Sequence, residues 1–345
     1  MKRRYLHLLL AGLIGMMAFN VAQSQDKIER KDRKAPDKPI ILTGDITDET
    51  VAGIKFKSGV KEELIPPTDV MRVFYNKLPV QAKLTFNTMF LNEDKEKDLS
   101  KTLKAYQDFA PQVATADLNP KRYVQYKIAS LTAQTAQSDP EKEQGKKLLT
   151  EFVNAHPASW EYSIAARQLA KMQVEKGEFD DARKTLETLT KREGVPPEIK
   201  IEADNMYIDV LFQNGDFDKV KERITAAKAV PATTVVQKAR FGVYEIGCEA
   251  QGEFKIEDVV KKLDETISKT NDNGVKALAY NVMGDCYSKK GQKRQAMYAW
   301  LWVDVVYYQD SSEHQKAMAR LLAYFKGEDD KDKVQLYEEK IKRSR

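Results

Sequence analysis

The chain has 345 residues, of which 57 are basic and 52 acidic, and only two are cysteines. Such scarce cysteine excludes a small disulfide-framework protein. The formal net charge of +5 falls to +2 without residues 1–24, which hold three basic and no acidic side chains. Overall charge therefore gives no support to nucleic-acid binding, and we expect no nucleic-acid partner.

The first 24 residues have the layout of a secretory signal peptide. Basic residues at positions 2–4 precede an apolar segment over 5–19, and the small residues Ala22 and Ser24 suit a cleavage site. This layout predicts export to the periplasm or cell envelope, with a retained N-terminal anchor as the alternative. No later stretch is apolar enough to cross a bilayer, so we expect no transmembrane span in the mature chain.

Two short segments follow the expected signal peptide. Residues 25–39 are almost all charged, with prolines and no apolar period, and predict a flexible linker. Residues 40–76 alternate apolar and polar side chains, with a turn at Ser58-Gly59, and predict a small antiparallel β module of three to five strands. This module resembles SH3-like or Sm-like barrels. It is too small to bury much core alone, so we expect it to dock on the helices or on another chain.

From residue 79 to 345 the pattern is that of amphipathic helices joined by short turns, and one turn recurs. A helical stretch, a glycine and a second helical stretch repeat at intervals of 38, 37 and 39 residues, at Gly177, Gly215, Gly252 and Gly291. Glycine suits the left-handed position that ends a helix, and Phe follows two residues later in three of the copies. This repeat predicts stacked helical hairpins.

The repeat resembles the tetratricopeptide repeat (TPR). The last copy matches best, through Tyr280, Met283-Gly284, Tyr287, Gly291, Ala296 and Trp300. The copy at Gly177 is the next best, and the copies at Gly215 and Gly252 keep mainly the glycine and the phenylalanine. Further hairpins are expected over 80–112, 120–154 and 312–343. The predicted fold is thus mainly α, an α-solenoid of about seven TPR-like hairpins preceded by the small β unit.

The resemblance implies a non-catalytic scaffold that binds a protein or peptide on the concave face formed by first helices. Position by position, the residues it places on that face are Arg167, Lys171, Asn205, Asp209, Asn281 and Asp285. Ordinary solvated side chains are the alternative reading of these positions. Two other functions stay open: a self-assembling structural component of the envelope, which would be a homo-oligomer, and a glycan-binding or enzymatic solenoid.

No pattern in the chain predicts a catalytic, cofactor or metal site. Gly284 and Gly291 lack the spacing of a phosphate-binding loop, and no zinc or calcium motif occurs. The two cysteines, Cys248 and Cys286, hold similar positions on adjacent first helices. They predict small half-buried thiols. A disulfide between them stays open as an alternative, although neighbouring helices usually lie too far apart for one.

The segment 297–308 is rich in aromatic residues, and these form two helical stripes. The first stripe holds Trp300, Val303 and Tyr307, and the second holds Tyr298, Trp302 and Val306. A helix that is apolar on both sides is what stacking between neighbouring hairpins requires. We therefore expect both stripes to be core, with a membrane or sugar surface as the alternative.

Overall fold

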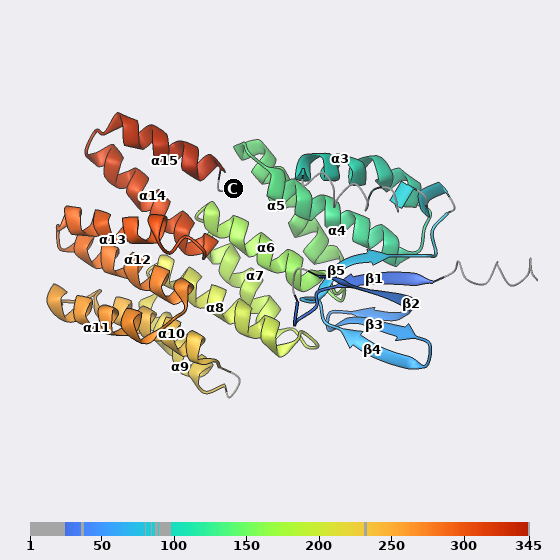
Figure 1. Ribbon diagram of the computed structural model, residues 1–345, viewed down its shortest axis with the longest axis horizontal. Coiled ribbons are helices and arrows are strands. Elements are labelled where there is room, and N and C mark those ends of the chain that lie inside the picture. The colour runs from blue at the N-terminus through green and yellow to red at the C-terminus, as the bar shows by residue number, and fades with distance from the viewer. Residues whose placement is uncertain are drawn as a thin grey trace, which may run out of the picture. The chain divides into compact units, whose positions relative to one another are not determined.

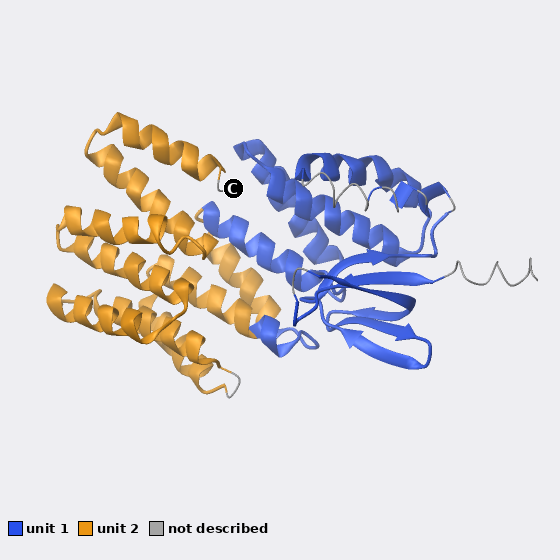
Figure 2. Ribbon diagram, viewed as in Figure 1, with its two compact units in different colours: residues 1–176, 191–200 blue, residues 177–190, 201–345 orange. Residues whose placement is uncertain are grey.

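The computed structural model describes residues 25–35, 38–79, 81–83, 85, 86, 89, 98–230 and 233–343. The expected signal peptide lies outside the described residues. The chain divides into two compact units (Figure 2): unit 1 holds residues 1–176 and 191–200, and unit 2 holds residues 177–190 and 201–345. The β module and the first helices therefore belong to one unit, and the later hairpins to the other.

Unit 1 begins with a five-stranded antiparallel sheet in the order β4-β3-β2-β1-β5 (Figure 1). Its strands are β1 (Asp26–Arg30), β2 (Ile40–Thr50), β3 (Gly53–Ser58), β4 (Lys61–Ile65) and β5 (Val70–Phe74). The long strand β2 pairs with β1 through its first half and with β3 through its second half. A register shift between Ile46 and Asp48 bends β2 where it passes from one partner to the other. The expected small antiparallel unit is confirmed.

The segment expected as a flexible linker contains a strand, so that prediction is wrong for residues 26–30. The β1 strand pairs with both β2 and β5, and its one apolar side chain, Ile28, is fully buried. The neighbouring Glu29 is also buried, and its carboxylate lies 2.9 Å from Nε of Arg72 on β5. Charged residues form this strand because their partners lie on other strands.

Between residues 98 and 176, unit 1 contains the helices α3 (Leu99–Phe109), α4 (Leu118–Thr135), α5 (Asp139–Ala155) and α6 (Tyr162–Glu175) and the 3₁₀ turn η1 (Ala110–Val113). The apolar face of the sheet shares one core with α3, η1 and α4, as the buried side chains of Phe56, Val73, Tyr106 and Tyr123 illustrate. The β module thus docks on helices of its own chain, as its small size required.

A buried ionic cluster links the sheet of unit 1 to its helices. Arg122 of α4 donates to both carboxylate oxygens of Glu161, at 3.1 and 3.2 Å, and also pairs with Glu49 of β2. The hydroxyl of Tyr75 donates to Glu49 at 3.2 Å. Two buried carboxylates therefore share one guanidinium, and burial raises the pKa of Glu161 to about 7 even though Arg122 opposes that rise.

Unit 2 consists of successive helical hairpins (Figure 1). Its helices are α7 (Phe179–Lys191), α8 (Pro197–Gln213), α9 (Phe217–Lys228), α10 (Val235–Glu249), α11 (Ile256–Lys269), α12 (Asn273–Lys289), α13 (Lys293–Val305), α14 (Ser311–Gly327) and α15 (Lys331–Arg343). Side-chain oxygens cap several first helices, since Thr234, Asp272 and Asp310 each accept a backbone N–H of the following turn. The hairpins expected over 120–154 and 312–343 correspond to α4/α5 and α14/α15.

Three of the four repeated glycines act as the sequence predicts. Gly177, Gly215 and Gly291 have φ angles of 75°, 79° and 73°, the left-handed conformation that ends a helix. Gly252 is not among the positive-φ glycines, so that expectation is wrong for the third copy. There the helix ends at Ala250, and Lys289 Nζ donates to the carbonyl oxygens of Ala250 and Gln251, at 3.1 and 2.6 Å. Lys289 belongs to α12, the first helix of the next hairpin, and it caps the C-terminal end of α10.

The best-preserved repeat contains a close approach between its two helices. A Cβ atom added to Gly284 of α12 would lie 2.3 Å from Nε1 of Trp300 on α13. Trp300 is buried, and its indole ring fills the space that the missing side chain leaves. The glycine in the middle of α12 is therefore a packing requirement rather than part of a loop.

Candidate functional site

The six residues expected on a concave binding face are divided between the two units. Arg167 and Lys171 lie on α6 of unit 1, where Lys171 is exposed and Arg167 Nε donates to the carbonyl oxygen of Ser163 at 3.3 Å. The other four, Asn205, Asp209, Asn281 and Asp285, lie on α8 and α12 of unit 2. The site described below is built within unit 2.

The first helices of unit 2, α8, α10, α12 and α14, form what we call the first-helix face, and a network of ion pairs crosses it. Lys316 of α14 places Nζ 2.6 Å from Oδ1 of Asp209 on α8 and 2.9 Å from Oε1 of Glu313. Tyr244 of α10 donates its hydroxyl to the same Asp209 oxygen at 2.9 Å. Arg240 Nη2 lies 3.4 Å from Glu313. First helices of four successive hairpins are thus held together by side chains.

This network occupies two of the expected partner-binding residues. Asn281 is 1% exposed, and its Nδ2 donates to the carboxylate and to the carbonyl oxygen of Glu313, both at 2.9 Å. Burial would raise the pKa of Asp209, but Lys316 and Tyr244 outweigh burial, and the pKa lies below its usual value. Both side chains therefore serve the packing of unit 2, because the solenoid curves tightly enough to bring α14 onto α8.

Asn205 and Asp285 have different surroundings. Asn205 is half-buried on α8, and its buried Oδ1 has no hydrogen-bond partner among the described residues. The Asp285 side chain is 38% exposed and pairs with Arg320 of α14, with Nε 2.6 Å from Oδ1. Partial burial raises the pKa of Asp285 against the opposing charge of Arg320. Asp285 is the member of the expected set that lines a cavity.

That cavity, which we call the inner pocket, has a volume of about 330 Å³ and lies toward the C-terminal ends of α8, α10 and α12. The aromatic side chains of Phe179, Phe212 and Phe217 make its apolar wall. Its polar lining consists of Gln213, Gln251, Asp285, Lys289 and Arg320. The resemblance to TPR repeats pointed to Asp285 but not to Arg320, because Arg320 lies on α14, outside the four glycine-centred repeat copies.

The inner pocket is preformed by close helix packing. A Cβ atom on Gly247 would lie 2.6 Å from the Phe212 ring, so the glycine lets that ring settle against α10. Phe212 also meets Phe217 edge to face, with ring centroids 5.6 Å apart. A second cavity of about 380 Å³ adjoins across Asp285 and Arg320, and Trp300 and Tyr324 line it. The Asp285–Arg320 pair therefore borders two cavities on one side of unit 2.

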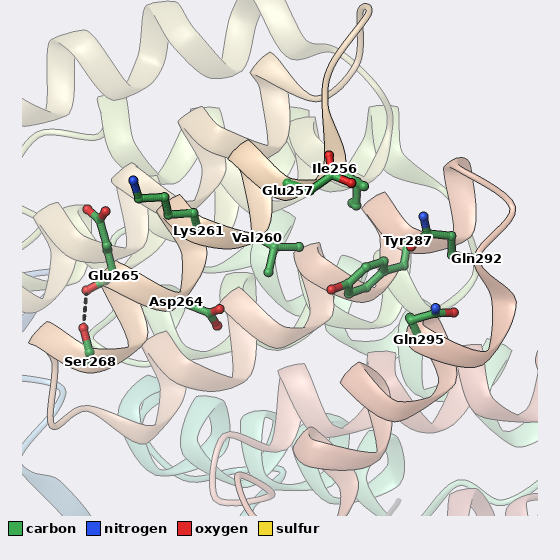
Figure 3. Close-up of a pocket in the computed structure, with 10 residues that line it drawn as sticks. All are labelled: Ile256, Glu257, Val260, Lys261, Asp264, Glu265, Ser268, Tyr287, Gln292 and Gln295. Carbon is green, nitrogen blue, oxygen red and sulfur yellow. Dashed lines mark hydrogen bonds between the residues drawn. The ribbon is translucent and has the colours of Figure 1, made fainter.

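A third cavity, which we call the outer groove, lies between α11 and α13 over α12 and has a volume of about 730 Å³. Figure 3 shows Val260 and Asp264 of α11 and Tyr287 of α12 facing its interior, with Gln295 of α13 on the opposite side. Its lining carries three carboxylates, Glu257, Asp264 and Glu265, against one basic side chain, Lys261. The outer groove is therefore acidic.

The aromatic stripes of α13 differ in burial, which corrects the expectation that both are core. Trp300 and Val303 are buried, and Tyr307 is half-buried. Tyr298, Trp302 and Val306 are 49%, 48% and 38% exposed. Side chains of α14 and α15, such as Leu321 and Tyr337, form one core cluster with Trp300 and Val303, whereas the second stripe remains at the surface.

The cysteines form no disulfide. Cys248 and Cys286 are both free and buried, on the neighbouring helices α10 and α12. Burial raises the pKa of each thiol to about 11. The Cys248 Sγ donates instead to the carbonyl oxygen of Phe217 at 3.9 Å. The thiols thus behave as small apolar side chains.

The two histidines contact other polar side chains. His156 contacts Gln125 at 3.0 Å, and His314 contacts Asp304 at 2.9 Å.

The described part of the chain contains no group of three or more His, Cys, Asp or Glu side chains arranged to hold a metal ion. Among the same residues, no helix combines the length and the apolar character needed to cross a membrane.

Comparison with solved structures identifies the class of fold. The chain is similar to a tetratricopeptide repeat protein from Parabacteroides merdae, with a TM-score of 0.52 and 12% identity over 77% of this chain and 94% of that protein. It is also similar, with a TM-score of 0.34 and 10% identity over 76% of each chain, to the apo form of RapI. No family model and no curated protein sequence matches the chain.

The first of these similarities shows the fold alone. Together with the helical hairpins and the left-handed glycines, it confirms the expected TPR-like helical repeat with a small antiparallel sheet at its N-terminal end. TPR-like solenoids are a class of interaction scaffold.

Proposed function

We propose that the protein is a non-catalytic interaction scaffold of the bacterial cell envelope that binds a partner polypeptide in the inner pocket. The observation that supports this most is the composition of that pocket. Phenylalanines from α7, α8 and α9 give it an apolar wall, and the Asp285–Arg320 pair and two glutamines give it a polar border. Apolar surface with a few placed polar groups is typical of specific binding sites.

The proposed mode of binding follows from these contacts. An apolar side chain of the partner would pack against the touching rings of Phe212 and Phe217, and the burial of that side chain would supply most of the binding free energy. The partner backbone would donate hydrogen bonds to the side-chain oxygens of Gln213 and Gln251, whose Nε2 atoms already donate to Asp209 and to the carbonyl oxygen of Gly247. The pair of Asp285 with Arg320 would fix the register of the bound segment.

The envelope location in this proposal rests on the sequence of residues 1–24, whose basic start and apolar centre favour export. The non-catalytic role rests on the kinds of side chain in the inner pocket. Its cysteine is Cys286, whose raised pKa leaves little thiolate at neutral pH. Asp285 is neutralised by Arg320 rather than set beside a second carboxylate.

The test blocks the inner pocket with a bulky side chain. Gln251 is exposed at its border, so Gln251→Trp should fill the opening without disturbing the core. Gln335→Trp, on an exposed position of α15 that lines no described cavity, is the matched control. Each tagged variant is crosslinked in living cells, the envelope fraction is isolated, and the captured polypeptides are identified by mass spectrometry.

A partner of the inner pocket should be captured by the unmodified protein and by Gln335→Trp, and lost with Gln251→Trp. Equal capture by all three variants would move the binding surface elsewhere. Recovery of the protein outside the envelope fraction would contradict the proposed location.

A further inference from the structure

Helices α12 and α13, which contribute to the outer groove, also carry an aromatic cluster that the proposed function does not use. The rings of Tyr280, Trp302 and Tyr307 lie nearly parallel, with interplanar angles of 16°, 16° and 27° and centroids 5.6 to 6.4 Å apart. We call these three side chains the aromatic platform. Trp302 is 48% exposed, and the two tyrosines are half-buried. Trp302 is therefore the part of the platform that is most open to the solvent.

Asp264 connects the platform to the outer groove. Burial is the main reason that the pKa values of Tyr280 and Tyr287 lie above their usual range, and the negative charge of Asp264 adds to the rise at both. This carboxylate therefore acts on one ring of the platform and on the ring that lines the groove. Both tyrosines project from α12, two helical turns apart. A spacing of seven residues places Tyr280 of the platform and Tyr287 of the groove on the same face of α12.

The charges of this surface are not balanced internally. Neither Asp264 nor Glu257 forms a salt bridge with any residue in the described part of the chain, whereas Glu265 pairs with Lys269 at 3.6 Å. The ion-pair network of the first-helix face is different, since its carboxylates, Asp209 and Glu313, each lie beside a lysine or an arginine. The protein also places a cation of its own on the platform, because Lys276 Nζ lies 5.7 Å from the centre of the Tyr307 ring. This surface is suited to further positive charge.

We propose that the outer groove and the aromatic platform bind an arginine-bearing segment of a partner polypeptide, with a guanidinium between Asp264 and the rings of the platform. A guanidinium is planar, stacks on aromatic rings and bonds to a carboxylate through two N–H groups. The apolar stem of the same side chain would lie along Val260. An anionic membrane surface is disfavoured because the three carboxylates of the groove would repel it.

This inference depends on the proposed role as a scaffold but concerns a different surface, so its test is made separately with purified components. The probe is a fluorescent eight-residue peptide of alternating arginine and leucine, and its matched control replaces every arginine with uncharged citrulline. Binding to the purified protein is measured by fluorescence polarisation at increasing salt concentration. The arginine peptide should bind and should weaken as salt rises, because exposed charge pairs are screened.

Variants then locate the binding. Asp264→Asn and Trp302→Ala should each weaken the arginine peptide about ten-fold. Asp258→Asn removes a carboxylate from the same helix but outside the groove, and Tyr298→Ala removes an equally exposed aromatic side chain from the same helix as Trp302. Both controls should stay within about two-fold of the unmodified protein. Circular dichroism of every variant verifies that the helices are retained.

Three outcomes would overturn the inference. Equal weakening by the groove and control variants would mean nonspecific attraction, and equal binding of the citrulline peptide would mean that charge is not recognised. Binding of a neutral N-acetylglucosamine tetrasaccharide that depends on Trp302 but not on Asp264 would instead identify a carbohydrate surface. None of these results bears on the inner pocket, whose test is the Gln251→Trp variant, so the two proposals fail separately.

Discussion

Lys316 and Asp209 are 107 residues apart in the chain, and their Nζ and Oδ1 atoms lie 2.6 Å from one another. They belong to α14 and α8, the first helices of hairpins that are three repeats apart. In an open solenoid each repeat contacts only its neighbours. The bond between Lys316 and Asp209 therefore means that unit 2 is curved enough for its first and last repeats to meet.

Replacing Lys316 by methionine should destabilise both ends of unit 2 together. The substitution keeps the length of the side chain but leaves Asp209 and Glu313 without their shared cation. Breaking a largely buried pair from one side costs about 3 kcal/mol. Hydrogen–deuterium exchange followed by mass spectrometry should show faster exchange in α8 as well as in α14.

The control for this substitution is Lys219→Met, whose side chain is 56% exposed and pairs with Asp216 at 3.7 Å. Its effect should stay below about 0.5 kcal/mol, as for most surface pairs. Faster exchange confined to α14 in the Lys316→Met protein would show that the ion pair between Lys316 and Asp209 does not stabilise α8.

Glu161 should make unit 1 less stable as the pH rises. Its pKa is about 7 in the folded protein against an ordinary value of 4.5. The folded state therefore holds a proton that the unfolded state has released, so stability is full below about pH 4.5 and declines as the pH rises to 7. The decline amounts to roughly 3 kcal/mol for a shift of this size. Urea unfolding at several pH values measures it.

Glu161→Gln should remove this decline, since Arg122 then faces the single carboxylate of Glu49. His156→Gln is the matched control, because the pKa of His156 is lowered by burial and by Arg122 and its contribution has the opposite sign. If Glu161→Gln keeps the full decline between pH 5 and 7, another group carries the proton.

Two glycines in helix interiors should respond to alanine in opposite directions. Gly284→Ala would put a Cβ atom 2.3 Å from Trp300 and should destabilise unit 2 by about 2 kcal/mol. Gly242→Ala, in α10, meets no atom within 4 Å and should stabilise by about 0.5 to 1 kcal/mol through helix propensity. Urea denaturation compares the two, and equal effects would contradict the close packing of α12 on α13.

The two cysteines should behave as buried thiols. With pKa values of about 11, both should react slowly with Ellman's reagent in the native protein and quickly in urea. A reducing agent should leave the melting temperature unchanged, because no disulfide links Cys248 to Cys286. A drop in melting temperature on reduction, with matching loss of a crosslinked species on mass spectrometry, would reverse this assignment.

Local patterns in the sequence were sufficient to predict the repeats. A left-handed turn strongly favours glycine, which is why Gly177, Gly215 and Gly291 could be placed from the sequence. The packing of Gly284 against Trp300 also follows from their positions in one hairpin. Helical periodicity predicted the apolar stripes of α13 but could not show that the stripe with Trp302 lacks a covering neighbour.

The missed features depend on residues far apart in the chain. The sequence of β1 predicted a charged linker because Glu29 meets its partner, Arg72, only when β5 lies beside β1. Lys316 meets Asp209 only because the curvature accumulates over several hairpins. Asn281, an expected binding residue, is buried because Glu313 of the adjacent first helix α14 accepts its hydrogen bonds. Such curvature is a sum of small packing angles, and no single repeat specifies it.

The position of β1 also sets the order in which the sheet can be completed. Ile28 pairs with Leu42 on one side and with Val73 on the other, so the first strand made is enclosed by the second and the last. During synthesis, β1 and β2 can pair early, but one side of β1 stays without its partner until residues 70–74 have emerged. A nascent chain that ends before them carries an open β edge, and that is the stage at which a chaperone would protect it.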